Sequence, residues 1–259
     1  MAAVEIENLV KSFGSLVAVS DVTFQVREGE IYGILGPNGA GKTTTIKCLM
    51  GLLDPDSGAS KIYGISSLDD PIEVKRLVGY VPEEHHLYDS LTPRELFEFI
   101  ASIRELPSER VNKRIKEMVK ALDFERYFDS MIVTLSQGNK QKTMLISALL
   151  HAPTLLILDE PFAGLDVRTA KIMKDIIKIH VEGGGSVLLS THIMEVAQGL
   201  CDRVGILDDG VMVGEGTIED LRSQAHEEGA TLEKIFLRLT EQEEEVQIGV
   251  DALREALSD

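Results

Sequence analysis

The sequence contains no tryptophan, only two cysteines and no long hydrophobic run. Two cysteines, Cys48 and Cys201, cannot build a disulfide framework, which excludes the small disulfide-stapled secreted folds and suits a reducing compartment. The longest apolar runs, such as residues 155–158, are far shorter than the ~20 residues that a membrane-spanning helix needs. The first ten residues hold two glutamates and no basic start, unlike a secretory signal. We therefore expect a chain without a membrane span of its own.

Basic residues are also scarce, with 26 Lys and Arg against 43 Asp and Glu and a net charge of −17. Such a surface repels the phosphates of nucleic acids, so we expect no nucleic-acid partner. The 259 residues are 44% hydrophobic, which is enough for one sizeable core with a smaller lobe attached. The acidity is partly concentrated at residues 241–259, where we expect a solvated helical tail.

Apolar residues follow the strand period at the start of the chain and in several later runs. Val22, Phe24 and Val26 alternate with polar neighbours, which predicts an antiparallel N-terminal β region. Short apolar runs typical of buried parallel strands occupy residues 31–35, 154–159, 186–190 and 203–207. Helical patterns separate these runs, and a hairpin that turns at residues 209–210 follows the last one. The alternation predicts an α/β fold with a mostly parallel sheet.

Between the early and later strand runs lies a stretch with only helical patterns. Thr92, Pro93 and Glu95 form a helix start, with a capping residue, a first-turn proline and a glutamate three residues after the cap. A second amphipathic helix fits residues 108–122. We expect a core at 1–83 and 135–225, an inserted helical lobe at about 84–134, and a C-terminal amphipathic helix with an acidic tail at 226–259.

The stretch GPNGAGKTTT at residues 36–45 matches the pattern G-x-x-x-x-G-K-[ST], between a predicted strand and a helix predicted over residues 42–53. The glycines let backbone N–H groups and the helix N-terminus surround a phosphate. Lys42 would reach the β- and γ-phosphates of ATP, and the Thr43 hydroxyl would ligate Mg²⁺. The pattern predicts a P-loop NTPase core whose nucleotide-binding residues are Gly36, Pro37, Asn38, Gly39, Ala40, Gly41, Lys42, Thr43 and Thr44.

Two acidic residues follow the apolar run at 154–158. Asp159 would end a buried strand, and the carboxyl ends of strands in a doubly wound sheet are where ligands gather. We expect Asp159 to hold Mg²⁺ through water. Glu160 comes next and is a candidate general base for the attacking water, although a strand-end carboxylate without a catalytic role is the alternative.

The stretch LSQGNKQK, which starts at Leu135, resembles the L-S-G-G-Q signature of ABC ATPases. Leu135, Ser136 and Gly138 match, whereas Gln137 replaces the first glycine and Asn139 replaces the final glutamine. From the residues alone, Ser136 caps a helix whose N-terminus could bind an anion, or it is only a cap. The order of motifs matches the family over most of the chain, which implies one ATPase domain at 1–240.

The resemblance implies roles for further residues. Phe13 stands where the family has an aromatic ring that stacks on adenine, and Glu83 stands where it has a glutamine near Mg²⁺. His192 takes the place of the family's switch histidine, which acts together with the catalytic glutamate. The family's pairing of two chains, head to tail, implies that Ser136, Gln137 and Gly138 contact the nucleotide held by the partner chain.

The family also implies partners and a location. This chain would pair with an identical or paralogous ATPase chain and power multi-span membrane permease subunits from the cytoplasmic face of the cell membrane. Residues 80–99 look most like ATPases that serve multidrug, antibiotic or polysaccharide export. A soluble ABC ATPase that acts on a protein assembly, for example of the iron–sulfur assembly type, is the alternative. A scaffold that only binds ATP is a third reading, which the full set of catalytic residues opposes.

Overall fold

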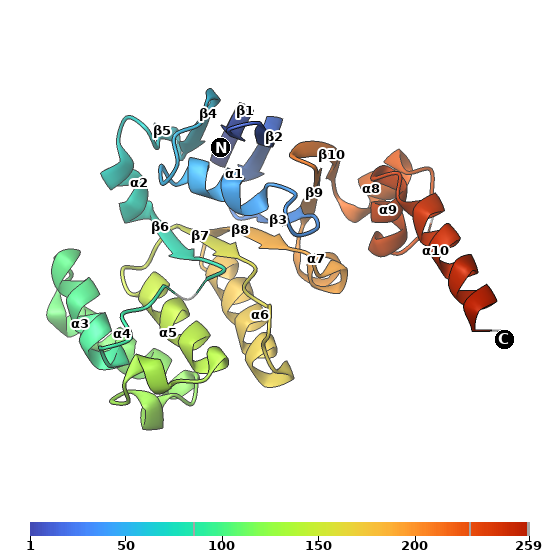
Figure 1. Ribbon diagram of the computed structural model, residues 1–259. Coiled ribbons are helices and arrows are strands. Elements are labelled where there is room, and N and C mark those ends of the chain that lie inside the picture. The colour runs from blue at the N-terminus through green and yellow to red at the C-terminus, as the bar shows by residue number, and fades with distance from the viewer. Residues whose placement is uncertain (85, 228, 258–259) are drawn as a thin grey trace.

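The computed structural model describes residues 1–84, 86–227 and 229–257, and its strands form two sheets (Figure 1). The strands are β1 (Ala2–Phe13), β2 (Leu16–Arg27), β3 (Ile31–Leu35), β4 (Ser57–Ile62), β5 (Ile65–Ser66), β6 (Val78–Val81), β7 (Leu155–Asp159), β8 (Ser186–Thr191), β9 (Arg203–Asp208) and β10 (Val211–Gly216). The larger sheet has the order β10-β9-β3-β8-β7-β6, and the smaller sheet has the order β2-β1-β4-β5.

The larger sheet is parallel from β9 to β6, and only its edge strand β10 is antiparallel. The β9–β10 hairpin turns through Asp209 and Gly210, which both have positive φ, as a tight two-residue turn requires. The smaller sheet is antiparallel throughout. These observations confirm the predicted α/β fold with a mostly parallel sheet and an antiparallel N-terminal β region.

Helices cover both faces of the larger sheet or form the inserted lobe (Figure 1). They are α1 (Lys42–Leu49), α2 (Pro71–Leu77), α3 (Pro93–Ile103), α4 (Ser108–Ala121), α5 (Gln137–Leu149), α6 (Val167–Glu182), α7 (Met194–Leu200), α8 (Ile218–Gln224), α9 (Leu232–Leu239), α10 (Glu243–Ala256) and the short 3₁₀ helices η1 (Glu125–Tyr127) and η2 (Ile132–Thr134).

Alternating side chains of the central strands enter two different cores. Ile157 and Leu188 pack with α1 and the smaller sheet, whereas Leu156, Leu158 and Leu189 pack with α5, α6 and α7. Both faces of the sheet are therefore covered, which explains why β3, β7 and β8 are buried along their whole length. Because β8 lies between β3 and β7, the carboxyl ends of the three strands meet at one edge.

The helical lobe has a core of its own. Thr92 and Glu95 form the predicted capping box at the start of α3, and Phe97 and Phe124 are fully buried between α3, α4 and η1. Ile146 and Leu150 belong to the same cluster, although α5 also packs on the larger sheet. Helix α5 therefore joins the lobe to the core.

Helix α1 is shorter than the sequence predicts. It ends at Leu49 instead of residue 53, because the N–H groups of Gly51 and Leu52 turn back to the carbonyls of Cys48 and Lys47. Gly51 has a φ of 62°, the left-handed conformation that closes such a turn. The glycine was the available signal for the stop.

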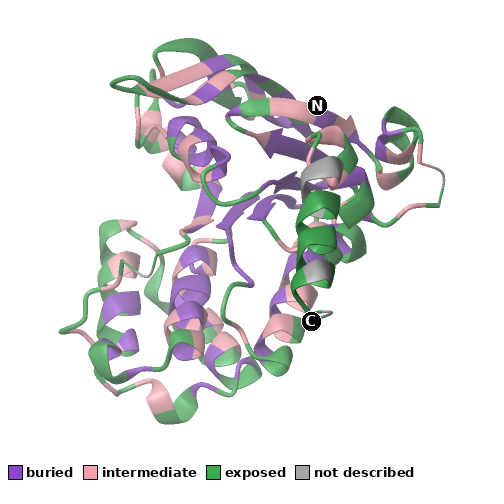
Figure 2. Cartoon of the chain, turned by 45° about the vertical axis from the view of Figure 1, so that its right-hand side comes forward, coloured by how far each residue is buried: buried purple, intermediate pink, exposed green. Residues whose placement is uncertain are grey.

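The C-terminal region consists of α8, α9 and α10. The predicted amphipathic helix is α9, whose Leu232, Ile235 and Phe236 pack against β9 and α7. Helix α10 carries most of the acidic tail and lies exposed at the end of the chain (Figure 2). Residues 258–259 lie outside the described part of the chain. Within the described residues, no helix combines the length and the apolar character that crossing a bilayer requires.

His151 links the lobe to the core and generates a prediction about stability. Its Nε2 lies 3.0 Å from the Val78 carbonyl, and burial, followed by the charge of Arg104, lowers the pKa of His151 from 6.5 to about 4. The pKa of His151 is lower in the folded protein than in the unfolded chain. The contribution of His151 to the free energy of unfolding is therefore fully present above pH 6.5 and is lost as the pH falls toward 4. It amounts to at most about 3 kcal/mol.

We expect urea unfolding to show a smaller loss of stability between pH 7 and pH 4 for His151→Gln than for the wild type. His86→Gln, which removes a largely exposed histidine, is the control for the loss of an imidazole. Parallel pH curves for His151→Gln and the wild type would contradict the assignment.

Candidate functional site

The loop between β3 and α1 forms a tight cradle. A Cβ atom on Gly36 would lie 2.2 Å from the Leu207 carbonyl oxygen, and one on Gly41, which has a φ of 100°, would lie 2.3 Å from that of Ala18. Both positions therefore require glycine. The loop borders a pocket of about 440 Å³, lined by Phe13, Leu16, Ala18, Asn38, Gly39, Ala40, Gly41, Lys42, Thr43, Thr44, Glu83 and Glu160.

Lys42 lies at the centre of this pocket and is almost fully buried. Its Nζ donates to the carbonyls of Gly36 and Pro37, at 2.8 and 3.0 Å, and lies 3.0 Å from Oε1 of Glu160. The two charged side chains are only 5% and 3% exposed. A buried ammonium and a buried carboxylate are stable only as a pair. When one of them moves away, the other needs a new partner of opposite charge.

Glu160 follows β7 with a φ of 48°, in the left-handed region that a non-glycine residue seldom adopts. Two contacts to Ser190 hold this conformation, because the Glu160 N–H donates to the Ser190 carbonyl and to its Oγ. The other carboxylate oxygen, Oε2, lies 2.9 Å from Nδ1 of His192. A carboxylate only accepts, so Nδ1 carries the proton. Glu160 is therefore held between Lys42 and His192.

Asp159 is fully buried one residue earlier, at the end of β7. Its Oδ1 accepts a short hydrogen bond from the Ser190 hydroxyl, and its Oδ2 has no partner among the described residues. Burial raises the pKa of Asp159 above the usual value, and the hydroxyls of Ser190 and Thr43 act in the opposite direction. An orphaned buried carboxylate oxygen indicates a place for a cation.

Thr43 and Glu83 supply further oxygen atoms at this place. The Thr43 hydroxyl lies 3.5 Å from Oε2 of Glu83. Burial, together with the charges of Asp159 and Glu83, raises the pKa of Tyr80, which keeps the phenol neutral beside them. Carboxylate and hydroxyl oxygens suit Mg²⁺, which takes few protein ligands and completes its shell with phosphates and water. The predicted metal residues Thr43, Glu83 and Asp159 thus fit magnesium.

The remaining predicted residues divide between the pocket and a separate surface. The ring of Phe13 is half exposed on the pocket wall, with Nζ of Lys11 5.6 Å from its centroid. The Ser136 hydroxyl caps α5 by accepting from the Asn139 N–H. Ser136 and Gln137 are exposed, and with Gly138 they lie outside the lining of the pocket.

Sequence reasoning missed Ser190. This residue contacts both acidic residues of the site, since its hydroxyl donates to the Asp159 carboxylate and its Oγ and carbonyl accept from the backbone N–H of Glu160. Its place two residues before the predicted His192, at the end of an apolar strand, was the only available signal. The contact itself follows from the pairing of β7 with β8, in which Asp159 lies opposite Ser190.

The profile that describes ABC transporter proteins matches residues 19–163. An uncharacterised ABC transporter ATP-binding protein of Methanocaldococcus jannaschii is 39% identical over 218 residues, which are 84% of this chain and 79% of that protein. This chain belongs to the ABC transporter family.

Two solved structures extend the comparison to the ABC fold. The ATP-binding subunit of an ABC transporter has a TM-score of 0.87 and 35% identity, and the match covers 92% of this chain and 99% of that chain. A dimeric ATP-binding cassette in a post-hydrolysis state, bound to ADP and Pi, has a TM-score of 0.74 and 27% identity, with 83% and 98% covered. The predictions that this protein is an ABC family member, an ATPase and the ATP-binding subunit of an ABC transporter are confirmed.

The contacts of Ser190 generate a test within the ABC site. Ser190→Ala removes the hydroxyl that stabilises the charged form of Asp159 and helps to hold Glu160, so we expect kcat to fall about 10-fold or more. The pKa of Asp159 should rise further, which moves the acid limb of the activity profile to higher pH. Phosphate release measured across pH checks both effects.

The control for this test lies on the same strand. Ser186 accepts from the Gly29 N–H at the opposite end of β8. Ser186→Ala should lower thermal stability and leave kcat unchanged. Equal kcat losses in the two variants would show that Ser190 has no specific role.

Glu83 departs from the glutamine of the family and can be tested by restoring it. Glu83→Gln keeps an oxygen near Thr43 but removes a charge, so we expect the Mg²⁺ concentration for half-maximal activity to rise and kcat to stay within about threefold. A magnesium titration of ATPase activity measures both. A large gain in kcat would mean that Glu83 is inhibitory.

Proposed function

We propose that two copies of this ABC ATPase, or one copy and a paralogue, close on two ATP molecules and hydrolyse them to drive transport through multi-span permease subunits. The protein would be held by these subunits at the cytoplasmic face of the cell membrane. The proposal rests on the positions of two elements that can bind phosphate, the P-loop cradle and the N-terminus of α5. Within one chain these two elements do not line the same pocket. A second chain brings the two together by two-fold symmetry.

Gly138 supports this arrangement. The nearest atom to a Cβ added there would be Oδ2 of Asp166, at 3.9 Å, and the φ of Gly138 is not positive. None of the residues that the structure describes therefore requires a glycine at the start of α5. The close approach of a nucleotide from a second chain would require one. Gln137 is exposed, so it can point away from that nucleotide.

The buried charges suggest how the ATPase residues work. Lys42 exchanges Glu160 for the β- and γ-phosphates of ATP, which offer more negative charge than one carboxylate. The freed carboxylate of Glu160 then accepts a proton from the attacking water. His192 holds Glu160 in position through Nδ1. Phe13 stacks on the adenine ring of ATP. Magnesium, bound near Thr43, Glu83 and Asp159, would neutralise charge on the phosphates.

The alternative of a soluble ABC ATPase that acts on a protein assembly is not favoured, because the relative and the structures that resemble this chain are ATP-binding proteins of transporters. Export as the direction of transport stays a prediction from the sequence. The test is to purify the protein from native membranes in mild detergent. A multi-span protein in stoichiometric amount supports the proposal, whereas soluble companions alone would favour the alternative.

The composite site can be tested without the permease. We expect Glu160→Gln to slow hydrolysis and to elute as a dimer with ATP and Mg²⁺ but as a monomer with ADP, because the γ-phosphate supplies the contact between the chains. Adding Gly138→Asp should keep the protein monomeric, since the new carboxylate repels that phosphate.

Gly249 gives a matched control, because it also lies in a helix, and a Cβ added there would likewise meet no close neighbour among the described residues. Glu160→Gln with Gly249→Asp should still form the dimer. Dimerisation of the Gly138→Asp double variant in gel filtration would place the interface elsewhere.

A further inference from the structure

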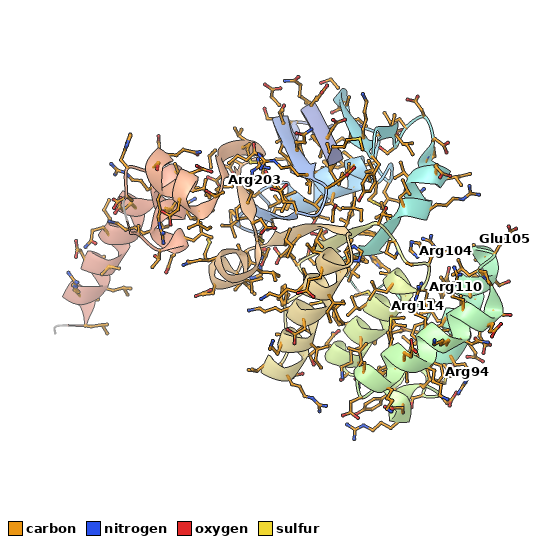
Figure 3. The ribbon with its side chains drawn as sticks, turned by 180° about the vertical axis from the view of Figure 1, so that it is seen from behind. Arg94, Arg104, Glu105, Arg110, Arg114 and Arg203 are labelled. Carbon is orange, nitrogen blue, oxygen red and sulfur yellow. The ribbon has the colours of Figure 1, made fainter. Side chains whose placement is uncertain are left out.

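Gln141, a residue of α5, is buried although its side chain is polar. It is only 5% exposed, and it belongs to the stretch LSQGNKQK, in which the family resemblance gives it no role. Figure 3 shows α5, in yellow-green, between α6 and the helical lobe. Nε2 of Gln141 donates to the Pro161 carbonyl at 3.3 Å. This hydrogen bond joins α5 to the residue that directly follows Glu160.

The Pro161 carbonyl depends on this donor. Pro161 is buried, and within the described part of the chain no backbone N–H donates to its carbonyl. A carbonyl only accepts, and a buried carbonyl without a donor is costly. Gln141 therefore fixes the orientation of the peptide group that contains this carbonyl.

Two constraints meet at Pro161. The proline ring fixes φ, and the hydrogen bond from Gln141 fixes the direction of the carbonyl and hence ψ. The backbone of Pro161 is thereby held at both of its rotatable bonds. Because Pro161 adjoins Glu160, these constraints hold Glu160 from its C-terminal side, whereas Ser190 holds its N–H.

Glu160 needs support on both sides because its backbone conformation is unfavourable in two respects. Its φ of 48° lies in the left-handed region, which is costly for a residue with a side chain. A residue before proline also prefers an extended backbone. If the Pro161 carbonyl were released, Glu160 would relax toward extended backbone, and its carboxylate would leave its place beside Lys42 and His192.

The segment that connects β7 to α6 lies along α5. Phe162 of this segment shares a buried cluster with Met144 of α5. Asp166 caps α6, and its Oδ2 would lie 3.9 Å from a Cβ on Gly138, in the first turn of α5. Helix α5 therefore supports the segment at several points, and its hydrogen bond to the proline is the support nearest to the proposed base.

We propose that Gln141 is a positioning residue for ATP hydrolysis. By holding the Pro161 carbonyl, it keeps the Glu160 carboxylate where it accepts a proton from the attacking water. Gln141 acts through the backbone, since it lies outside the lining of the pocket at the P-loop. The inference rests on the proposed role of Glu160 as general base and adds a residue on which that role depends.

The experiment removes the donor in the full-length protein. Gln141→Met keeps a side chain of similar length, and we expect kcat to fall about 10-fold or more because the base is misplaced. The KM for ATP and the affinity for a fluorescent ATP analogue should not weaken, since the P-loop is unchanged. Gln141→Ala, which introduces no new group, should give the same pattern and serves as the second variant if methionine prevents folding. Phosphate release measures kcat and KM, and thermal unfolding shows that each variant is folded.

Thr143→Val is the matched control. Thr143 is fully buried on the same helix, but its hydroxyl donates to the Asn139 carbonyl within α5 itself, at 2.9 Å. Thr143→Val should therefore leave kcat unchanged. An equal loss of kcat in Thr143→Val and Gln141→Met would show that disturbed packing of α5 explains both, and would overturn the proposal.

The decisive step combines Gln141→Met with Glu160→Gln. Because Gln141 acts through Glu160, the two effects should not multiply, and the second substitution should change the remaining rate by less than about twofold. Single-turnover measurements with excess protein resolve such slow rates. Losses that multiply would show that Gln141 acts on another part of the site, and would also overturn the proposal.

The remaining outcomes separate this inference from the proposed function. If Glu160→Gln hydrolyses ATP as fast as the wild type, the proposed role of Glu160 fails, and the inference fails with it. If Glu160→Gln is slow but the Gln141 variants keep the wild-type kcat, or change only KM, the inference alone is overturned. A loss of kcat at unchanged KM, absent in Thr143→Val and absent in the Glu160→Gln background, supports it.

Discussion

The buried ion pair between Lys42 and Glu160 is the constraint on which the rest of the site depends. Two charges that are almost removed from water stabilise the fold only while each has a partner. The P-loop places Lys42, and the end of β7 places Glu160 in a left-handed conformation that its bonds to Ser190 maintain. These residues can meet because β3, β8 and β7 are neighbours in the sheet. A phosphate that enters the cradle must therefore rearrange the same charges that hold the site together.

Helix α5 connects the surface that this protein would present to a second ATPase chain with the boundary between the core and the lobe. Its N-terminus carries Ser136 and Gly138, which suit a nucleotide held by a second ATPase chain. The other end carries Ser147 and His151, which line a pocket between the core and the lobe. Thirteen residues at 1.5 Å each give a rigid rod of about 20 Å between them. Because α5 packs on both the sheet and the lobe, a movement at either end is transmitted through well-packed side chains.

Two departures from the family's motifs, Gln137 and Glu83, lie where the structure can accept them. Gln137 is exposed at the first turn of α5, so its side chain displaces nothing within the chain. Glu83 keeps an oxygen near the Thr43 hydroxyl, in the place where the family has a glutamine. The carboxylate adds negative charge near the buried Asp159, which a bound magnesium ion would offset. Both replacements therefore fit the geometry of the site, and only Glu83 changes its charge.

By itself, the sequence determined the features that depend on neighbouring residues: the P-loop, the apolar strands, the caps at Thr92 and Ser136, and the carboxylates that end β7. Each follows from glycine conformation, from periodicity or from hydrogen bonds within one turn, so it can be read without the fold. The end of α1 was missed although Gly51 signalled it, because the helical pattern continues beyond the glycine. The role of Ser190 was decided only by the tertiary structure. Ser190 reaches Asp159 across 31 residues of sequence, and the pocket beside Arg104 joins four segments whose proximity exists only once the sheet and the lobe have packed on α5.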